Sequence, residues 1–219
     1  MKSKNPLAIG VALGAGLIAV VLRVLPHPPA FTSVGACSLF GGARVRGWRA
    51  FALPIAVMVV SDLVLWLLSG FDSNFSLLHI SRVYVYGCFL IYVAIGRCLW
   101  ERNSILSTTL AATLGGLQFF IITNFCTWLV QPWMAMPDQF RYSRDLEGLM
   151  TCFVAALPFY QGETAFGEHP FALLTDFRLS IVLTILSDII FTTAYLQIYG
   201  KLAQDEKQSA AATNAEAAA

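Results

Sequence analysis

Long apolar runs, separated by short charged segments, fill most of this 219-residue sequence. Five of these runs are long enough to cross the roughly 30 Å hydrocarbon core of a bilayer as helices. They span residues 6–25, 50–69, 83–100, 105–130 and 179–199. Charged residues make up 12% of the chain, whereas a soluble domain carries about 25%. The pattern predicts an all-α integral membrane protein and excludes a soluble enzyme, a secreted disulfide module and a disordered regulator.

Two shorter apolar segments decide how many helices cross the membrane. Residues 31–43 would form a helix of about 20 Å, which is shorter than the hydrocarbon core. Residues 146–160 carry Glu147 near the start and Pro158 near the end. This second segment fits a half-helix better than a full span.

The distribution of Lys and Arg favours one arrangement, because these residues accumulate in cytoplasmic loops. If 31–43 crosses and 146–160 does not, nine Lys and Arg residues lie inside and five lie outside. The other arrangements give at best eight to six, or seven to seven. We therefore predict a six-transmembrane-helix bundle with both termini in the cytoplasm. A short re-entrant or interfacial helix would lie between the fifth and sixth helices.

Residues 1–203 are predicted to form a single transmembrane domain. The Ala-rich tail 204–219 is predicted to be disordered, although its alanines could extend the last helix. The outer loop 131–178 contains seven aromatic residues, which favours an ordered lid over a solvated linker. Pro158 would end the short helix and leave Phe159 available to close a pocket.

Two aspartates lie within apolar helices, in the similar contexts Val60-Ser-Asp-Leu-Val and Leu186-Ser-Asp-Ile-Ile. An aspartate at this depth costs about 2.5–3.5 kcal/mol, so Asp62 and Asp188 should each face the bundle interior with a partner. Arg23 is a candidate partner for one of them. Three roles stay open: structural hydrogen bonds or ion pairs, a solute site, and proton or ion coupling.

Asn124 and Trp128 lie near the outer end of the fifth helix. Asn124 is expected to form a hydrogen bond in the interior, because an unpaired amide in hydrocarbon costs several kcal/mol. Trp128 would either stack on a solute or anchor the helix at the membrane interface. Both residues are candidates for the floor of an outward-facing site.

No catalytic, metal or cofactor motif is present. The three histidines fall in separate loops, and the five cysteines lie in or beside apolar runs without a C-x-x-C spacing. No phosphate-binding glycine loop or nucleophile elbow occurs. The net charge is +1, without a basic stripe that would bind nucleic acid. We expect neither an enzyme nor a resident metal or cofactor.

Several stretches together resemble a known bacterial family. They are Arg23-x-x-Pro26-x-Pro28-x-x-Phe31-Thr-Ser-Val-Gly-Ala, Leu39-Phe-Gly-Gly-Ala43, Ser61-Asp62-Leu63, Thr123-Asn124-Phe125-x-x-Trp128, Leu157-Pro158-Phe159 and Ser187-Asp188. The chain resembles an uncharacterised family of bacterial membrane proteins described as transport proteins. More distantly, the order of its elements is similar to the substrate-binding S components of energy-coupling-factor (ECF) vitamin transporters.

This resemblance implies a subunit of the bacterial cytoplasmic membrane that captures a micronutrient from outside. It implies docking on a transmembrane coupling subunit, served by ATPases, through Ala8 and Ala12 of the first helix. In an alternative interpretation, these small residues only pack the protein's own bundle.

The leading hypothesis is therefore a transport subunit in the lipid bilayer that binds a small-molecule solute with Arg23, Asp62, Asn124, Trp128, Phe159 and Asp188. The alternatives are an intramembrane enzyme that uses Asp62 and Asp188, and a scaffold protein without transport activity. A transporter requires polar groups that converge on one cavity. The hypothesis can therefore be examined by asking whether Asp62, Asn124, Trp128 and Asp188 face the same space.

Overall fold

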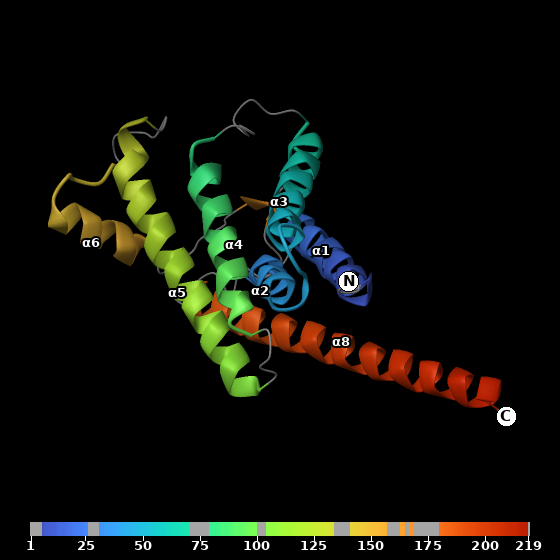
Figure 1. Cartoon of the computed structure of the whole chain (residues 1–219). Coiled ribbons are helices and arrows are strands. Elements are labelled where there is room, and N and C mark those ends of the chain that lie inside the picture. The colour runs from blue at the N-terminus through green and yellow to red at the C-terminus, as the bar shows by residue number, and fades with distance from the viewer. Residues whose placement is uncertain are drawn as a thin grey trace.

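The computed structural model describes residues 6–25, 31–70, 79–99, 104–133, 141–156, 163–164, 167–168 and 180–218. These residues form a helical protein (Figure 1). The helices are α1 (Pro6–Val24), α2 (Val34–Arg44), α3 (Arg49–Leu68), α4 (Ser81–Arg97), α5 (Ile105–Val130), the 3-10 turn η1 (Gln131–Trp133), α6 (Leu146–Ala155) and α8 (Ser180–Ala218). A short antiparallel ladder pairs β1 (Glu163–Thr164) with β2 (Gly167–Glu168).

Four helices in the described part of the chain are long and apolar enough to cross a membrane. They are α1, α3, α5 together with η1, and α8. They indicate a membrane-embedded protein, as the composition predicts. Helix α2 contains 11 residues and is too short for a span, whereas α4 contains 17 residues and lies at the lower limit of the roughly 17–25 residues that a span requires. The six-span arrangement and a re-entrant role for α6 stay predictions.

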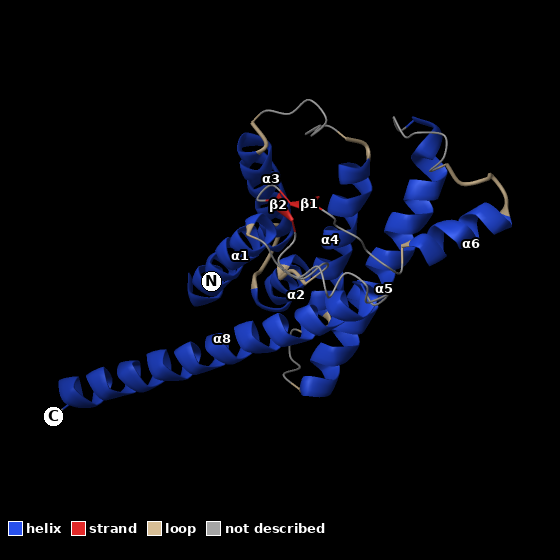
Figure 2. Cartoon of the chain, turned by 180° about the vertical axis from the view of Figure 1, so that it is seen from behind, coloured by secondary structure: helices blue, strands red, loops and turns tan. Residues whose placement is uncertain are grey.

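The short helix α2 forms the centre of the bundle. All of its residues are buried, and α1, α3, α4, α5 and α8 contact it. Figure 1 and the reverse view in Figure 2 both show α2 enclosed by its neighbours. Its sequence, Val-Gly-Ala-Cys-Ser-Leu-Phe-Gly-Gly-Ala-Arg, consists mostly of small residues. Small side chains allow neighbouring backbones to approach closely, which is how helices pack without a hydrophobic driving force.

The closest approach is between α2 and α4. A Cβ atom at Gly42 would clash with the carbonyl oxygen of Val93, and one at Gly96 would clash with that of Leu39. The two glycines therefore allow direct backbone contact between the helices. This contact positions α4, which carries several of the polar residues described below.

The last residue of α2 forms hydrogen bonds with backbone carbonyl groups at the C-terminal end of the helix. Arg44 is buried and donates hydrogen bonds to the carbonyl oxygens of Ala43 (3.0 Å) and Leu99 (3.2 Å). Its guanidinium group also lies 5.7 Å from the centre of the Tyr199 ring. A cation at a helix C-terminus is favourable because the last carbonyl groups carry partial negative charge.

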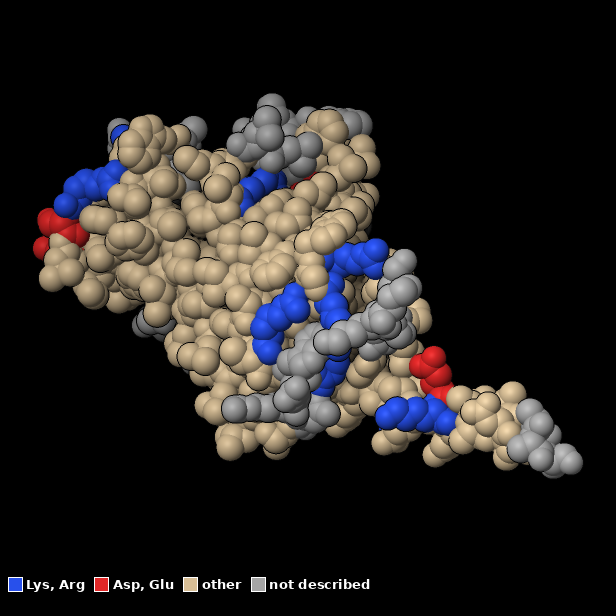
Figure 3. Space-filling view, in the orientation of Figure 1, with Lys and Arg blue, Asp and Glu red and all other residues tan. Residues whose placement is uncertain are grey.

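Two groups of arginines mark opposite ends of the bundle. Arg97 at the end of α4 donates to the carbonyl oxygen of Gly47 (2.8 Å), which places it beside the segment that contains Arg44 and Arg49. Arg82, at the start of α4, belongs to the group at the opposite end of the same helix. Figure 3 shows that charged side chains form a few local clusters on this face, with uncharged surface between them.

The tail follows the second of its two predicted alternatives, extension of the last helix. Residues 204–218 continue α8, which projects away from the bundle in Figure 1, and residues 204–215 are exposed. The physical reason is composition, because no Gly or Pro follows Gly200 and alanine has the highest helix propensity.

We predict that Gly96→Ala destabilises the protein by about 1–3 kcal/mol, because the new methyl group would force α2 away from α4. Gly87→Ala on the same helix is the matched control, since no atom lies within 4 Å of a Cβ there. It should be neutral or stabilise the protein by up to about 1 kcal/mol. Equal thermal unfolding of the two variants in detergent would contradict the direct contact.

Candidate functional site

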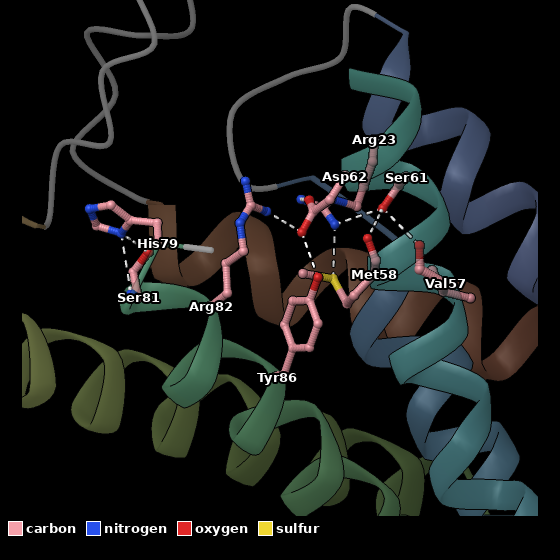
Figure 4. Close-up of polar contacts among 9 residues, drawn as sticks. All are labelled: Arg23, Val57, Met58, Ser61, Asp62, His79, Ser81, Arg82 and Tyr86. Carbon is pink, nitrogen blue, oxygen red and sulfur yellow. Dashed lines mark hydrogen bonds and ion pairs between the residues drawn. The ribbon is translucent and has the colours of Figure 1, made fainter. Parts of the chain in front are cut away.

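A buried carboxylate joins three helices at one end of the bundle. Asp62 on α3 is 2% exposed, and Arg23 of α1 donates to its Oδ1 atom at 3.0 Å. Arg82 at the start of α4 forms a second ion pair with Oδ2, and the Tyr86 hydroxyl donates to the same oxygen at 2.6 Å. Figure 4 shows these side chains converging from α1, α3 and α4. We call Arg23, Asp62, Arg82 and Tyr86 the Asp62 cluster.

Neighbours on α3 hold the guanidinium group of Arg23 in place. Its Nη1 atom donates to Ser61 Oγ (2.8 Å) and to Met58 Sδ (2.9 Å) (Figure 4). Ser61 Oγ in turn donates to carbonyl oxygens of the preceding turn. The prediction that Arg23 partners a buried aspartate is confirmed.

Helix periodicity explains why α4 contributes two groups to the cluster. Arg82 and Tyr86 are four residues apart, so they lie on the same face of α4. Sequence reasoning missed both residues. Arg82 stands just outside the apolar run, where it is easily interpreted as a loop charge, and Tyr86 resembles an ordinary interfacial aromatic.

The Asp62 cluster is rich in guanidinium groups. Two guanidinium groups, whose side chains are each 20% exposed, face one carboxylate that is 3% exposed. Guanidinium groups have five N–H donors each, arranged to match carboxylates and phosphates. The cluster therefore has the chemical character of a partly buried anion site.

Asp188 belongs to a second group of residues. It is 1% exposed on α8, and it accepts hydrogen bonds from the Tyr92 hydroxyl (2.7 Å) and from the backbone N–H of Ala36 in the first turn of α2. Gly35 makes room for this carboxylate, because a Cβ at that position would overlap it. Asp188 therefore caps the N-terminus of α2, where Ser33 makes no capping hydrogen bond.

The two aspartates do not share partners. Tyr86 and Tyr92, which bind Asp62 and Asp188 respectively, lie six residues apart on α4. This spacing corresponds to about 9 Å along the helix axis. The structure brings Arg23 and Asp62 together and places Asp188 in a different polar group.

Asn124 and Trp128 lie on the side of α5 that meets α6. Asn124 Nδ2 donates to the carbonyl oxygen of Phe120 in its own helix (2.7 Å). Trp128 Nε1 donates to the carbonyl oxygen of Ser143 (2.9 Å), and the Arg144 guanidinium group lies 5.3 Å from the Trp128 ring centre. These contacts fasten the segment before α6 to α5. Phe159 and most of the proposed lid lie outside the described residues.

The start of α6 has a local cap. The backbone N–H of Gly148 and the hydroxyl of Ser143 donate to Asp145, and these hydrogen bonds lower the pKa of its exposed carboxyl group. An aspartate at this position stabilises the first turn of a helix. The short helix predicted from residue 146 thus begins where the sequence suggests, and it ends at Ala155.

Ala8 and Ala12 are buried inside the chain's own bundle. Helix α1 contacts α2, α3 and α8, and Gly16 of the same stripe packs against Val57. These contacts favour the interpretation in which the small residues serve internal packing.

Comparison with known proteins gives one family. A family model described as a family of unknown function (DUF6580) matches residues 3–175. No curated protein and no solved structure matches the chain. The matched region includes the whole Asp62 cluster, whereas α8 with Asp188 follows it.

We predict that Tyr86→Phe lowers the free energy of unfolding by about 1.5–3 kcal/mol, because it removes a hydrogen bond to a charged group. Tyr84→Phe, one half-turn earlier, removes a neutral hydrogen bond to Thr127 (3.0 Å) and should cost about 0.5–1.5 kcal/mol. Unfolding of the two purified variants in detergent measures the difference. A smaller cost at Tyr86 than at Tyr84 would count against a tightly bound Asp62 cluster.

Proposed function

The chain belongs to the DUF6580 family of unknown function, and we propose that it binds a small anionic solute at the Asp62 cluster as a subunit of a membrane transport system. The observation that carries this proposal is the meeting of two guanidinium groups at one buried carboxylate. The proposal assigns no catalytic step to the chain.

The chemistry of the cluster supports an anionic group on the solute. A carboxylate or phosphate can accept two parallel hydrogen bonds from an arginine, which gives both attraction and orientation. Low dielectric around the site strengthens such bonds relative to water. Asp62 would hold the two arginines side by side, against their mutual repulsion, until the solute arrives.

The position of the cluster supports capture from the outer face. Arg23 and Arg82 lie at the end of α4 where the helix begins, whereas Arg97 lies at its other end beside Arg44 and Arg49. The end with more arginines is expected on the cytoplasmic side. The Asp62 cluster would then open outward.

The transport partner is part of the same proposal. A coupling subunit that carries ATPases could move the captured solute across the membrane, as the similarity to S components suggests. Its docking surface would differ from Ala8 and Ala12, because both residues are buried in the bundle.

We predict that Arg82→Gln weakens binding of a co-purified anionic solute by about 10- to 100-fold, because it removes charge-assisted hydrogen bonds. Native mass spectrometry of the purified full-length protein measures the retained small molecule and its occupancy. Arg97→Gln is the matched control, since it removes an arginine from the opposite end of the same helix. It should leave the occupancy unchanged.

Two further variants separate binding from folding. Arg82→Lys keeps the charge but loses the planar fork, so it should bind more weakly than the wild type and more tightly than Arg82→Gln. Asp62→Asn removes the carboxylate that holds the two arginines side by side, so it should also weaken binding in protein that folds. Retention of a neutral or cationic molecule, independent of Arg82, would refute the proposed anion site.

We predict that both termini are cytoplasmic. Reporter fusions at position 2 and after Gly200 should both give a cytoplasmic signal in a membrane topology assay. A fusion after Leu25 should report the opposite side, because α1 separates it from the N-terminus. External signals from both terminal fusions would reverse the proposed orientation.

A further inference from the structure

A second polar cluster lies deep in the bundle and takes no part in the proposed anion site. It contains Ser33 before α2 and three residues of α8, namely Asp188, Thr192 and Tyr195. These four residues are 0%, 1%, 0% and 3% exposed. We call them the Asp188 cluster.

Helix geometry places the members together. Thr192 and Tyr195 follow Asp188 by four and seven residues, so all three lie on one face of α8. Asp188 accepts the Ala36 N–H that an N-cap side chain at Ser33 would usually accept, which puts the carboxylate close to Ser33. The Tyr195 hydroxyl lies beside Ser33 Oγ.

Three hydroxyl oxygens of this cluster have hydrogen-bonding capacity left. Thr192 Oγ1 is buried without a partner within the described ranges, and Ser33 Oγ and Tyr195 Oη are buried facing each other. Thr193 Oγ1, next along α8, is also buried without a described partner, but it lies on a different face of the helix. A buried polar group without a partner costs about 1–3 kcal/mol, so hydroxyls beside a carboxylate point to a polar ligand.

The surroundings of Asp188 exclude bulk water, so burial opposes its negative charge and the contacts within the bundle offset this cost only in part. The N-terminus of α2 and the Tyr92 hydroxyl both stabilise negative charge on this carboxylate. Aromatic rings cover Tyr195, since Phe191 stacks on it at 6.2 Å and Phe40 meets it edge-on at 6.1 Å. Carboxylates have about four acceptor positions, so Asp188 has capacity left after these two hydrogen bonds.

We propose that the Asp188 cluster binds a hard monovalent cation such as Na⁺. Oxygen ligands suit hard cations, and a cation can engage several hydroxyl oxygens at once, whereas a proton would satisfy only the carboxylate. A single carboxylate balances a single positive charge. A divalent ion would leave an extra buried charge next to the positive end of α2.

A transition-metal site does not explain the cluster. The described part of the chain contains no group of three or more His, Cys, Asp or Glu residues that could hold such an ion. Hydroxyl ligands and one carboxylate are instead typical of alkali-metal recognition, where softer metals compete poorly.

The direct test is binding of ²²Na⁺ to the purified full-length protein in detergent, measured by scintillation proximity at constant ionic strength with choline chloride. We expect saturable binding that unlabelled NaCl displaces. NaCl should also raise the thermal unfolding temperature relative to choline chloride, since a ligand that binds only the folded state stabilises it.

Variants identify the ligands. Thr192→Val removes one hydroxyl oxygen at nearly constant volume and should weaken the apparent Na⁺ affinity about tenfold, corresponding to roughly 1.4 kcal/mol. Thr193→Val is the matched control, because it removes a hydroxyl that is also buried without a described partner but lies about 100° away around the same helix, and it should leave the affinity unchanged. Asp188→Asn keeps an acceptor for the Ala36 N–H but removes the charge, and it should abolish binding.

Each outcome decides the proposal. Absence of saturable ²²Na⁺ binding together with equal unfolding temperatures in NaCl and choline chloride would overturn it, whether or not stability depends on pH. Equal Na⁺ affinity for Thr192→Val and the wild type would also overturn it, and this variant decides the matter even if Asp188→Asn does not fold. The result is independent of the anion site, because Arg82→Gln should retain ²²Na⁺ binding.

Discussion

The structure depends on the complete burial of α2, a helix of only 11 residues. A helix leaves four N–H and four C=O groups unpaired at its ends, and inside a bundle no bulk water is available to satisfy them. Asp188 supplies a carboxylate at the N-terminus, while Arg44 supplies a guanidinium group at the C-terminus. Both charges have the sign that the helix dipole requires. These two ends give α2 one defined position, and the other helices pack around it.

This arrangement also distributes the chemistry. The close contact of Gly42 and Gly96 holds α4 against α2, so α4 reaches both aspartates, from positions about 120° apart around its axis. Tyr86 contacts the carboxylate from α3 and Tyr92 contacts the one from α8. The cluster that faces one end of the bundle combines two cations with one anion, whereas the deeper cluster combines one anion with neutral hydroxyls. The guanidinium donors of the first cluster and the carboxylate and hydroxyl oxygens of the second are the reason for assigning them ligands of opposite sign.

Length and hydropathy predict most helices to within a few residues, because an apolar run and its charged borders define a membrane helix directly. The Arg23–Asp62 pair is predictable as well, since a buried carboxylate needs a cation. The role of Arg82 depends on how α3 and α4 pack against each other, and this packing cannot be predicted from hydropathy. Asp188 caps a helix that begins about 150 residues earlier, and no local pattern links the two. The similar local sequences around Asp62 and Asp188 suggest a shared site. In the structure, however, the two aspartates contact different positions along α4 and therefore belong to separate clusters.

The cap on α2 has a consequence for biosynthesis. A chain emerges from the ribosome N-terminus first, so α2 is made long before α8 delivers Asp188. Until then the N–H of Ala36 lacks its native acceptor. Helix α2 alone is too short, and its ends are too polar, to remain stably in lipid. The core of this protein is therefore completed only when its last helix inserts. In a nascent chain that does not yet contain α8, α2 must therefore lie at the membrane surface or remain bound to the insertion machinery.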